Sequence, residues 1–182
     1  MTHPYGENVY FTDEMRYGTR TFCKRRWTTC GHRPCCKMKI GYQWAYLFVA
    51  LSPYTGDVFA CALSHLNKDC FDVFLKEFKA YLTEEKIVKD NEKCLLIGDG
   101  ATAHQSDIVS KYGIDWKKLP TACPELNPVE RFFQELRKHT SNQVFENIEQ
   151  IDKLIDELLK EYMTNREAVK KLTLFPYLIR NA

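Results

Sequence analysis

Residues 93–100 have the sequence KCLLIGDG, in which a short apolar strand ends directly at Asp99 and Gly100. In open α/β sheets, ligands bind outside the carboxyl ends of the strands, so a carboxylate at this position can approach a phosphate-bound metal ion. An Asp-Gly pair is also a common turn, and the stretch alone favours neither interpretation. It predicts the edge of an α/β sheet, with Asp99 as a candidate metal ligand.

The segments around this strand alternate between strand and helix patterns. Strand patterns cover residues 8–14, 44–51, 57–63, 93–98 and 115–119, and helix patterns cover residues 69–82, 103–112 and 127–140. A last long helix follows, which Asn147 caps with Gln150 as its capping-box partner. Pro53 and Gly56 predict a hairpin turn between the second and third strands, and residues 16–42 are expected to be irregular or hairpin-like. This order predicts one α/β domain over residues 1–182, with a mixed central sheet flanked by helices. The ribonuclease-H-like fold has this order, and so do other α/β folds.

The composition is that of an ordinary globular protein. The chain has 182 residues, of which 45% are hydrophobic and 27% charged, and these values argue against disorder. No apolar run approaches the roughly 18 residues of a membrane span, so we expect no membrane segment. The N-terminal sequence MTHPYGENVY lacks the pattern of a signal peptide, which favours the cytoplasm.

Basic residues gather in the first third of the chain, although the net charge is only +2. No Asp or Glu occurs between Met15 and Gly56, where aromatic residues interleave with Arg16, Arg20, Lys24, Arg25, Arg26, Arg33, Lys37 and Lys39. Cations beside aromatic surface are typical of nucleic-acid binding, although a solvated basic hairpin has the same composition. The stretch also contains Cys23, Cys30, Cys35 and Cys36, which are better interpreted as reduced thiols than as a zinc site because their spacing matches no standard CxxC pair.

Two further carboxylates are candidates for the same site as Asp99. Asp13 shares a strand face with Val9 and Phe11, and a charged group on a buried face is costly unless it is paired or metal-bound. Its alternatives are a solvated strand end, or Glu14 on the opposite face as the functional carboxylate.

Glu130 stands at the third position of a helix that Asn127 caps and Pro128 begins. This pattern is nearly a capping box, which by itself is the better interpretation of Glu130. The same geometry would fix a carboxylate at the start of a helix, as a metal ligand requires. Three acidic groups in one cleft would raise one another's pKa, and Mg²⁺ or Mn²⁺ would remove that conflict. Spacing in the sequence does not show that the three groups converge.

Two longer stretches are distinctive: LLIGDGATAH at residues 95–104 and LPTACPELNPVERFFQELR at residues 119–137. Together with Trp27-x-x-x-Gly31-x-Arg33-Pro34 and Ser52-Pro-x-Thr-Gly56, they resemble the catalytic domain of mariner-like DDE transposases, in particular their bacterial insertion-sequence branch. The resemblance covers about residues 8–160. The chain departs from the family in a shorter spacing between Asp99 and Glu130, and in Ala122-Cys123 where the family usually has an aromatic or polar pair.

The resemblance implies a Mg²⁺-dependent endonuclease and strand transferase, with Mn²⁺ as a substitute, that acts on transposon ends and target DNA. Asp13, Asp99 and Glu130 would hold the metal ions, and His104 would either contact the scissile phosphate or make a structural hydrogen bond. DNA backbone contacts would come from Lys24, Arg25, Arg26, Arg33, Lys37 and Lys39. A homodimer is expected, and so is association with the nucleoid when DNA is bound. The family's N-terminal helix-turn-helix region is not found in this sequence, and a separate helix-turn-helix polypeptide is one candidate partner that the sequence leaves open.

Three alternatives remain at the level of sequence. The chain can be a general ribonuclease-H-like nuclease, which cleaves without strand transfer. It can be a catalytically silent transposase remnant that binds DNA or a partner. It can also be an interaction module stabilised by zinc on the Cys23–Cys36 segment.

Overall fold

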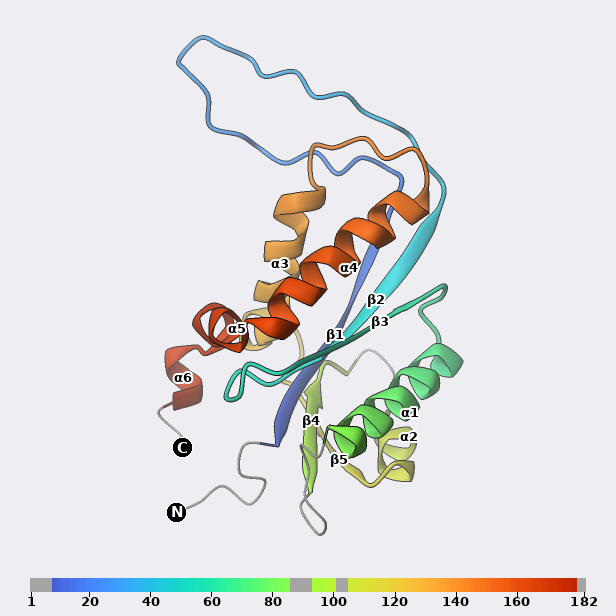
Figure 1. The fold of residues 1–182 in the computed structure, drawn as a ribbon. Coiled ribbons are helices and arrows are strands. Elements are labelled where there is room, and N and C mark those ends of the chain that lie inside the picture. Colours follow the sequence, from blue (N-terminus) through green and yellow to red (C-terminus); the bar gives the residue numbers. More distant parts are fainter. Residues whose placement is uncertain (1–7, 86–92, 101–104, 180–182) are drawn as a thin grey trace.

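The computed structural model describes residues 8–85, 93–100 and 105–179, with the backbone alone for Gln105 and Ser106. It has a five-stranded sheet flanked by helices (Figure 1). The elements are β1 (Val9–Gly18), β2 (Trp44–Leu51), β3 (Val58–Leu63), α1 (Lys68–Glu84), β4 (Cys94–Gly98), α2 (Gln105–Lys111), β5 (Ile114–Lys118), a short 3₁₀ helix η1 (Pro124–Leu126), α3 (Pro128–Thr140), α4 (Ile148–Thr164), α5 (Arg166–Thr173) and α6 (Pro176–Ile179).

The sheet is mixed, as the sequence predicts. Its strand order is β3-β2-β1-β4-β5, with antiparallel pairing among β1, β2 and β3 and parallel pairing of β4 with β1 and β5. The central strand β1 lies between the hairpin and the parallel half. Its register aligns Val9 with Leu95 and Phe11 with Ile97. Continuing this register by two residues places Asp13 beside Asp99, at the carboxyl end of β4.

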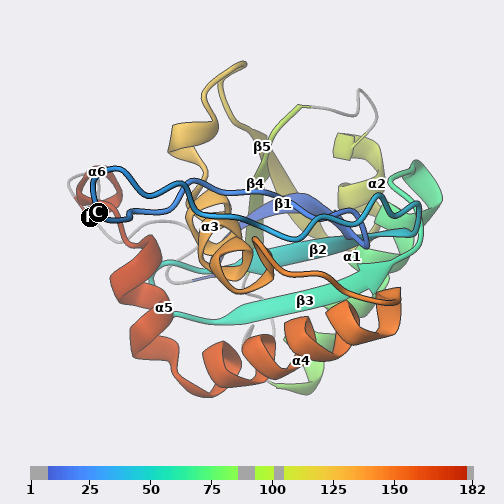
Figure 2. The same ribbon diagram turned by 90° about the horizontal axis from the view of Figure 1, so that it is seen from above.

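Helices cover both faces of the sheet (Figure 2). On one face α3 and α4 pack against Leu47, Val49 and Leu51, and on the other α1 and α2 pack against Phe48 and Ala50. All five of these β2 side chains are fully buried. Burial on both faces explains why β2 has a near-continuous apolar sequence and why its bounds agree with the prediction.

Strand β1 runs four residues beyond its predicted end because it pairs with β2 as far as Gly18 and Trp44. Residues 19–43, here called the arm, connect these two strands and extend beyond the sheet (Figure 1). The base of the arm is held by backbone hydrogen bonds from Thr19 N to Gln43 O and from Thr21 N to Lys39 O, both 3.1 Å. The expected irregular or hairpin-like segment is therefore an extended loop with a paired base.

Asparagine caps four helices, among them α4, whose predicted cap Asn147 accepts a hydrogen bond from Gln150 N. The predicted capping box is wrong in one detail. Gln150 Oε1 accepts from Glu146 N at 2.9 Å, one residue before the cap, and so fixes the entry of the chain into the helix.

Asp57 stabilises the hairpin turn between β2 and β3, and its side chain is only 4% exposed. Its carboxylate accepts hydrogen bonds from Tyr10 Oη (2.8 Å), Tyr81 Oη (2.7 Å) and Arg166 Nη2 (3.1 Å). The preceding Gly56 has a φ of +73°, and a Cβ there would collide with the backbone of Arg166. The turn thus joins β1, α1 and α5. Helices α5 and α6 lie beyond the last element that the sequence predicted.

Among the described residues, none of the helices combines the length and the apolar character that crossing a membrane requires.

Candidate active site

Asp13, Asp99 and Glu130 line one cavity of about 330 Å³. The cavity is bounded by the segment from Lys118 to Pro124 and by Asn127. The structure therefore brings together the three carboxylates that the sequence singled out, although they come from β1, the end of β4 and the start of α3.

Asp13, and not Glu14, faces this cavity. It lies on the same face of β1 as Phe11 and Met15, which pack against α3 and α4. Asp13 is half-buried, and its Oδ1 accepts a hydrogen bond of 2.8 Å from the backbone N–H of Glu14. The expectation that a charged group on this face needs a partner is met in part by Asn127.

Asn127 joins the start of α3 to the central strand. Its Oδ1 accepts from Val129 N at 3.2 Å, which caps the helix. Its Nδ2 donates to Thr12 O at 3.1 Å and to Asp13 Oδ2 at 3.2 Å. Because Asn127 is only 3% exposed, these contacts are made away from water. The sequence identified Asn127 as a helix cap but not as a residue that positions Asp13.

The carboxylate of Glu130 does not accept the capping-box hydrogen bond that its spacing predicted. The backbone N–H of Asn127, which a capping box would give to Glu130, donates instead to Pro124 O at 3.0 Å. Glu130 Oε2 pairs with Arg137 Nη1 at 3.6 Å, and both side chains are about one-third exposed. An ion pair with this exposure is weak, so Glu130 can exchange it for another cation.

The electrostatics of the cavity reflect crowded negative charge. Burial raises the pKa of Asp13 to about 7; the N–H of Glu14 lowers it, the charges of Glu130 and Asp99 raise it, and Arg137 lowers it. Burial also raises the pKa of Glu14 to about 8, with the charges of Asp13 and Asp99 adding to the effect. The unliganded fold therefore disfavours full ionisation at this edge of the sheet.

These residues fit a divalent cation of the Mg²⁺ or Mn²⁺ type. The donors are carboxylate oxygens, which such hard ions prefer, and their mutual repulsion is the conflict that a cation relieves. Within residues 8–85, 93–100 and 105–179, no three His, Cys, Asp or Glu side chains are arranged closely enough to hold an ion as they stand.

The fold and the sequence family agree with this geometry. Residues 8–152 match the family described as DDE superfamily endonuclease, which is most of the chain. The chain belongs to this family. Its predicted resemblance to DDE transposase catalytic domains is thereby confirmed at the level of the family.

Solved structures of Mos1 mariner transposase share the fold. The paired-end complex with Mn and the pre-cleavage transpososome superpose with TM-scores of 0.68 and 0.69 at 14% identity, over 90% and 91% of this chain and 53% of theirs. The isolated Mos1 catalytic domain superposes with a TM-score of 0.63 at 14% identity, over 91% of this chain and 78% of its own. The chain thus spans about half the length of the transposase chains in the complexes. The predicted ribonuclease-H-like fold is confirmed. A comparison of the sequence with curated proteins finds no match.

Two cations near the carboxylates were not predicted from the sequence: Lys118, which lines this cavity, and Arg137, which pairs with Glu130. Lys118 ends β5 and lines the cavity, and a Cβ on Gly100 would collide with its side chain. The rule that drew attention to Asp99, that function gathers at the carboxyl ends of strands, applies equally to Lys118. Arg137 lies two turns along α3 from Glu130, and its charge reaches both Glu130 and Asp13.

The predicted DNA-binding residues lie apart from the cavity, on the arm. Exposed side chains along it include Lys24, Arg25, Arg26, Arg33 and Lys37. Lys39 is half-buried, and its Nζ donates to the backbone oxygens of Phe145 (3.1 Å) and Glu146 (2.7 Å). It fastens the arm to the connection between α3 and α4, which differs from the exposed role expected for it. His104 lies outside the described residues.

A second tie holds the arm at the same connection. Asn142 Oδ1 accepts from Lys24 N at 2.9 Å, and Asn142 N donates to Phe22 O at 2.9 Å. Beyond these ties Cys23, Cys30, Cys35 and Cys36 are exposed free thiols. They form no metal-holding group of three in the part of the chain that the structure describes.

Proposed function

We propose that the chain is the catalytic core of a DNA transposase, a single domain that hydrolyses a phosphodiester at a transposon end and joins the freed 3′-hydroxyl to target DNA. One observation carries the proposal: Asp13, Asp99 and Glu130, from three separate elements of a DDE-family fold, line one cavity. Asp13 and Asp99 would hold one divalent cation between neighbouring strands, and Glu130 would complete the site from α3.

Mos1 mariner transposase forms paired-end complexes with Mn and with Mg, which supports a divalent cation in this chain. Asp13, Asp99 and Glu130 would hold such cations, which would supply charge stabilisation for an in-line displacement at phosphorus. The residues of this chain supply position and charge. Asn127 fixes the orientation of Asp13 through its 3.2 Å hydrogen bond. Lys118 and Arg137 would neutralise the phosphate that approaches the cavity.

The partners follow from the same reasoning. The exposed cations of the arm would contact the DNA backbone without reading its sequence. Mos1 transposase forms paired-end complexes, which supports a homodimer of this chain with one active site on each DNA end. Recognition of a particular end sequence would need a helix-turn-helix region, whether it belongs to the same polypeptide or to another.

The first test is Mn²⁺-dependent nicking of supercoiled plasmid by the native chain, Asp99→Ala and Glu130→Ala. We expect nicking by the native chain and its loss, by a factor of about a hundred or more, in both variants. Thermal melting shows that each variant is folded. Nicking that persists in both variants would place the reaction elsewhere and refute the assignment.

Joining of a 3′-hydroxyl oligonucleotide to plasmid then separates a transposase from a nuclease that only cleaves. DNA binding that ignores Mn²⁺ and survives Asp99→Ala, with no nicking by the native chain, would instead identify a silent DNA-binding remnant.

A further inference from the structure

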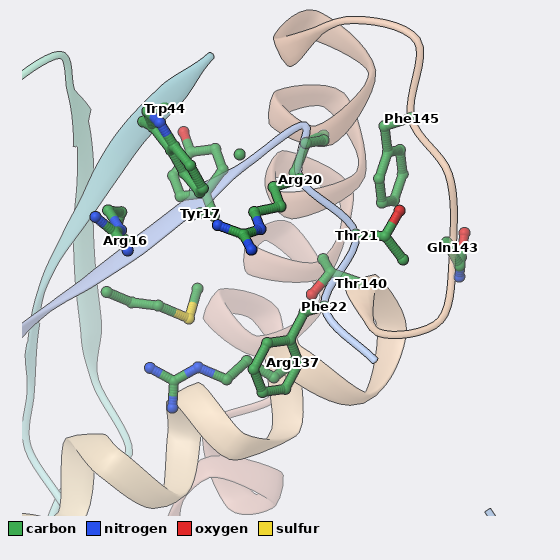
Figure 3. Close-up of a pocket in the computed structure, with 13 residues that line it drawn as sticks. Arg16, Tyr17, Arg20, Thr21, Phe22, Trp44, Arg137, Thr140, Gln143 and Phe145 are labelled. Atoms are coloured by element: carbon green, nitrogen blue, oxygen red, sulfur yellow. The ribbon is translucent and has the colours of Figure 1, made fainter. Parts of the chain in front are cut away.

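A second cavity, of about 540 Å³, lies where the end of β1, the base of the arm and the end of α3 meet (Figure 3). Its walls combine flat aromatic rings with cations: Tyr17, Phe22, Trp44, Arg16, Arg20 and Arg137. No carboxylate is among the described residues that line it. The sequence counted Arg16, Arg20 and Trp44 in the basic stretch but assigned them no site.

The guanidinium groups are arranged around the open space. Arg16 Cζ lies 4.6 Å from the centre of the Trp44 ring, a cation–π contact. Figure 3 shows the guanidinium group of Arg20 turned toward the space between Trp44 and Phe22, whereas the side chain of Arg137 extends past Phe22. Phe22 is 59% exposed and Trp44 is half-buried, so each presents ring surface that the fold leaves uncovered.

Arg137 links this cavity to the carboxylate site, because it lines the cavity and also pairs with Glu130, which lines the other one. Tyr17, which also lines this cavity, follows Asp13 by four residues on the same face of β1, a separation of roughly 13 Å along an extended strand. A short run of nucleotides spans that distance, so one DNA strand can occupy both cavities.

We propose that this cavity binds one unpaired nucleotide of the DNA strand that passes through the carboxylate site. The base would stack on Trp44 or Phe22, and a neighbouring phosphate would accept hydrogen bonds from Arg20 and Arg137. The inference rests on the proposed function, because it takes DNA as the substrate. A base inside a duplex is covered on both faces, so the nucleotide is single-stranded or turned out of the helix.

Charge decides between a nucleotide and an apolar protein side chain as the occupant. Arg137 already pairs with Glu130, whereas Arg16 and Arg20 make no ion pair with a carboxylate of the described residues. Their planar donors match phosphate geometry, so an anion in this space would be stabilised. Aromatic rings beside such cations are the arrangement that binds unpaired bases without sequence preference.

Tryptophan fluorescence tests the contact directly, with a short oligothymidylate strand as the probe and EDTA present so that no cleavage occurs. The chain has three tryptophans. In a Trp27→Phe background the emission comes from Trp44 and Trp116, and Trp116 lies on the edge strand β5, which β1 and β4 separate from β2. Oligothymidylate should quench this emission, and adding Trp44→Phe should abolish the quenching.

Affinity measured by fluorescence anisotropy gives a second readout. Trp44→Ala should weaken oligothymidylate binding about tenfold or more, while Trp44→Phe should stay within about threefold because a ring still stacks. Binding of a blunt hairpin duplex should change less than about twofold in either variant. Arg20→Ala should weaken single-strand binding and reduce its salt dependence by about one phosphate. The matched control Lys160→Ala, an exposed cation on α4, should do neither.

Equal binding of single strand and duplex, with neither altered by Trp44→Ala, would overturn the proposal, and so would quenching that survives Trp44→Phe. Thermal melting establishes that each variant is folded. The proposed function is judged separately, by nicking in Mn²⁺. Single-strand binding that depends on Trp44 without any nicking would keep the nucleotide site and reject the transposase activity, and the reverse result would do the opposite.

Discussion

Replacing Asn127 with alanine should destabilise the fold more than the loss of a helix cap does. The substitution removes the cap of α3, which is worth about 1 kcal/mol. It also removes the hydrogen bonds to Thr12 O and Asp13 Oδ2, each worth about 1 kcal/mol when buried. We therefore expect a loss of about 3 kcal/mol in the free energy of unfolding, a substantial part of the stability of an ordinary domain.

Asn147→Ala provides the matched control, because Asn147 caps α4 by accepting from Gln150 N and is exposed to solvent. Its loss should cost about 1 kcal/mol. Urea denaturation of both variants in EDTA then isolates the contacts to β1 as a difference of about 2 kcal/mol. Equal losses in the two variants would refute the reasoning, since Asn127 would then act as a cap alone.

A third variant, Asn127→Asp, separates the cap from the positioning of Asp13. Aspartate caps a helix as well as asparagine does, but it has no amide to donate to Asp13 Oδ2. It also places a further carboxylate beside Asp13, whose pKa is already about 7. We expect Asn127→Asp to be destabilised in EDTA and to recover more stability in Mn²⁺ than the native chain gains. A recovery no greater than that of Asn127→Ala would contradict the proposed proximity of Asn127 to the metal site.

Three further predictions test the site and its support. The fold raises the pKa of Asp13 to about 7 from its ordinary value of 3.8. Between these two pH values, Asp13 in the folded chain therefore keeps a proton that it has lost in the unfolded chain. Burial raises the pKa of Glu14 as well, to about 8. Stability should therefore fall as pH rises from about 4 to 8, and Mn²⁺ should raise the melting temperature more at pH 8 than at pH 6. Asp13→Asn should reduce both trends, and the contribution of Glu14 should remain. Asp57→Ala should lower the free energy of unfolding by about 3–5 kcal/mol, because it leaves Tyr10 Oη and Arg166 without their buried partner. Urea denaturation measures this loss. Nicking per folded molecule should be unchanged. Lys118→Met keeps the aliphatic stem and should slow nicking about tenfold without reducing the stabilisation by Mn²⁺; a loss of that stabilisation would show that Lys118 supports the metal site instead.

The strands and helices of the sheet were predictable because their signals are local. Burial on both faces gives β2 its continuous apolar sequence, and helical spacing marks the buried face of α1, which includes Phe71, Phe74 and Phe78. Asp99 was found through its position at the end of a strand. Glu130 depended on the family resemblance, because Asn127 and Pro128 before it by themselves favour a capping role.

Contacts between distant residues were not predictable in this way. Asn127 and Asp13 are 114 residues apart, and nothing local in either segment shows that they touch. Lys39 was counted among the exposed cations, yet its Nζ reaches the backbone of Glu146, 107 residues away. Arg137 illustrates the same limit, because its role depends on where α3 lies against β1. Composition identified the arm as basic but could not say which of its cations face solvent.

Two crossing elements, β1 and α3, carry both cavities. Asp13 and Arg16 belong to β1, while Glu130 and Arg137 belong to α3. The two elements are held together by buried packing, for example through Phe132 and Phe133, which are fully buried in the core that also contains Phe11 and Met15. The distance between the carboxylates and the guanidinium groups is therefore set before any DNA binds.

The arm is tied to this frame at the far end of α3. Asn142 and Lys39 connect it to the segment between α3 and α4, a few residues beyond Arg137. In the proposed complex, a DNA strand held by the cations of the arm would enter beside the guanidinium groups and reach the carboxylates along β1. Fixed geometry of this kind suits in-line displacement at phosphorus, in which positioning and charge neutralisation provide most of the catalysis. On this reasoning, substitutions that loosen α3 from β1 should impair nicking even when all three carboxylates are intact.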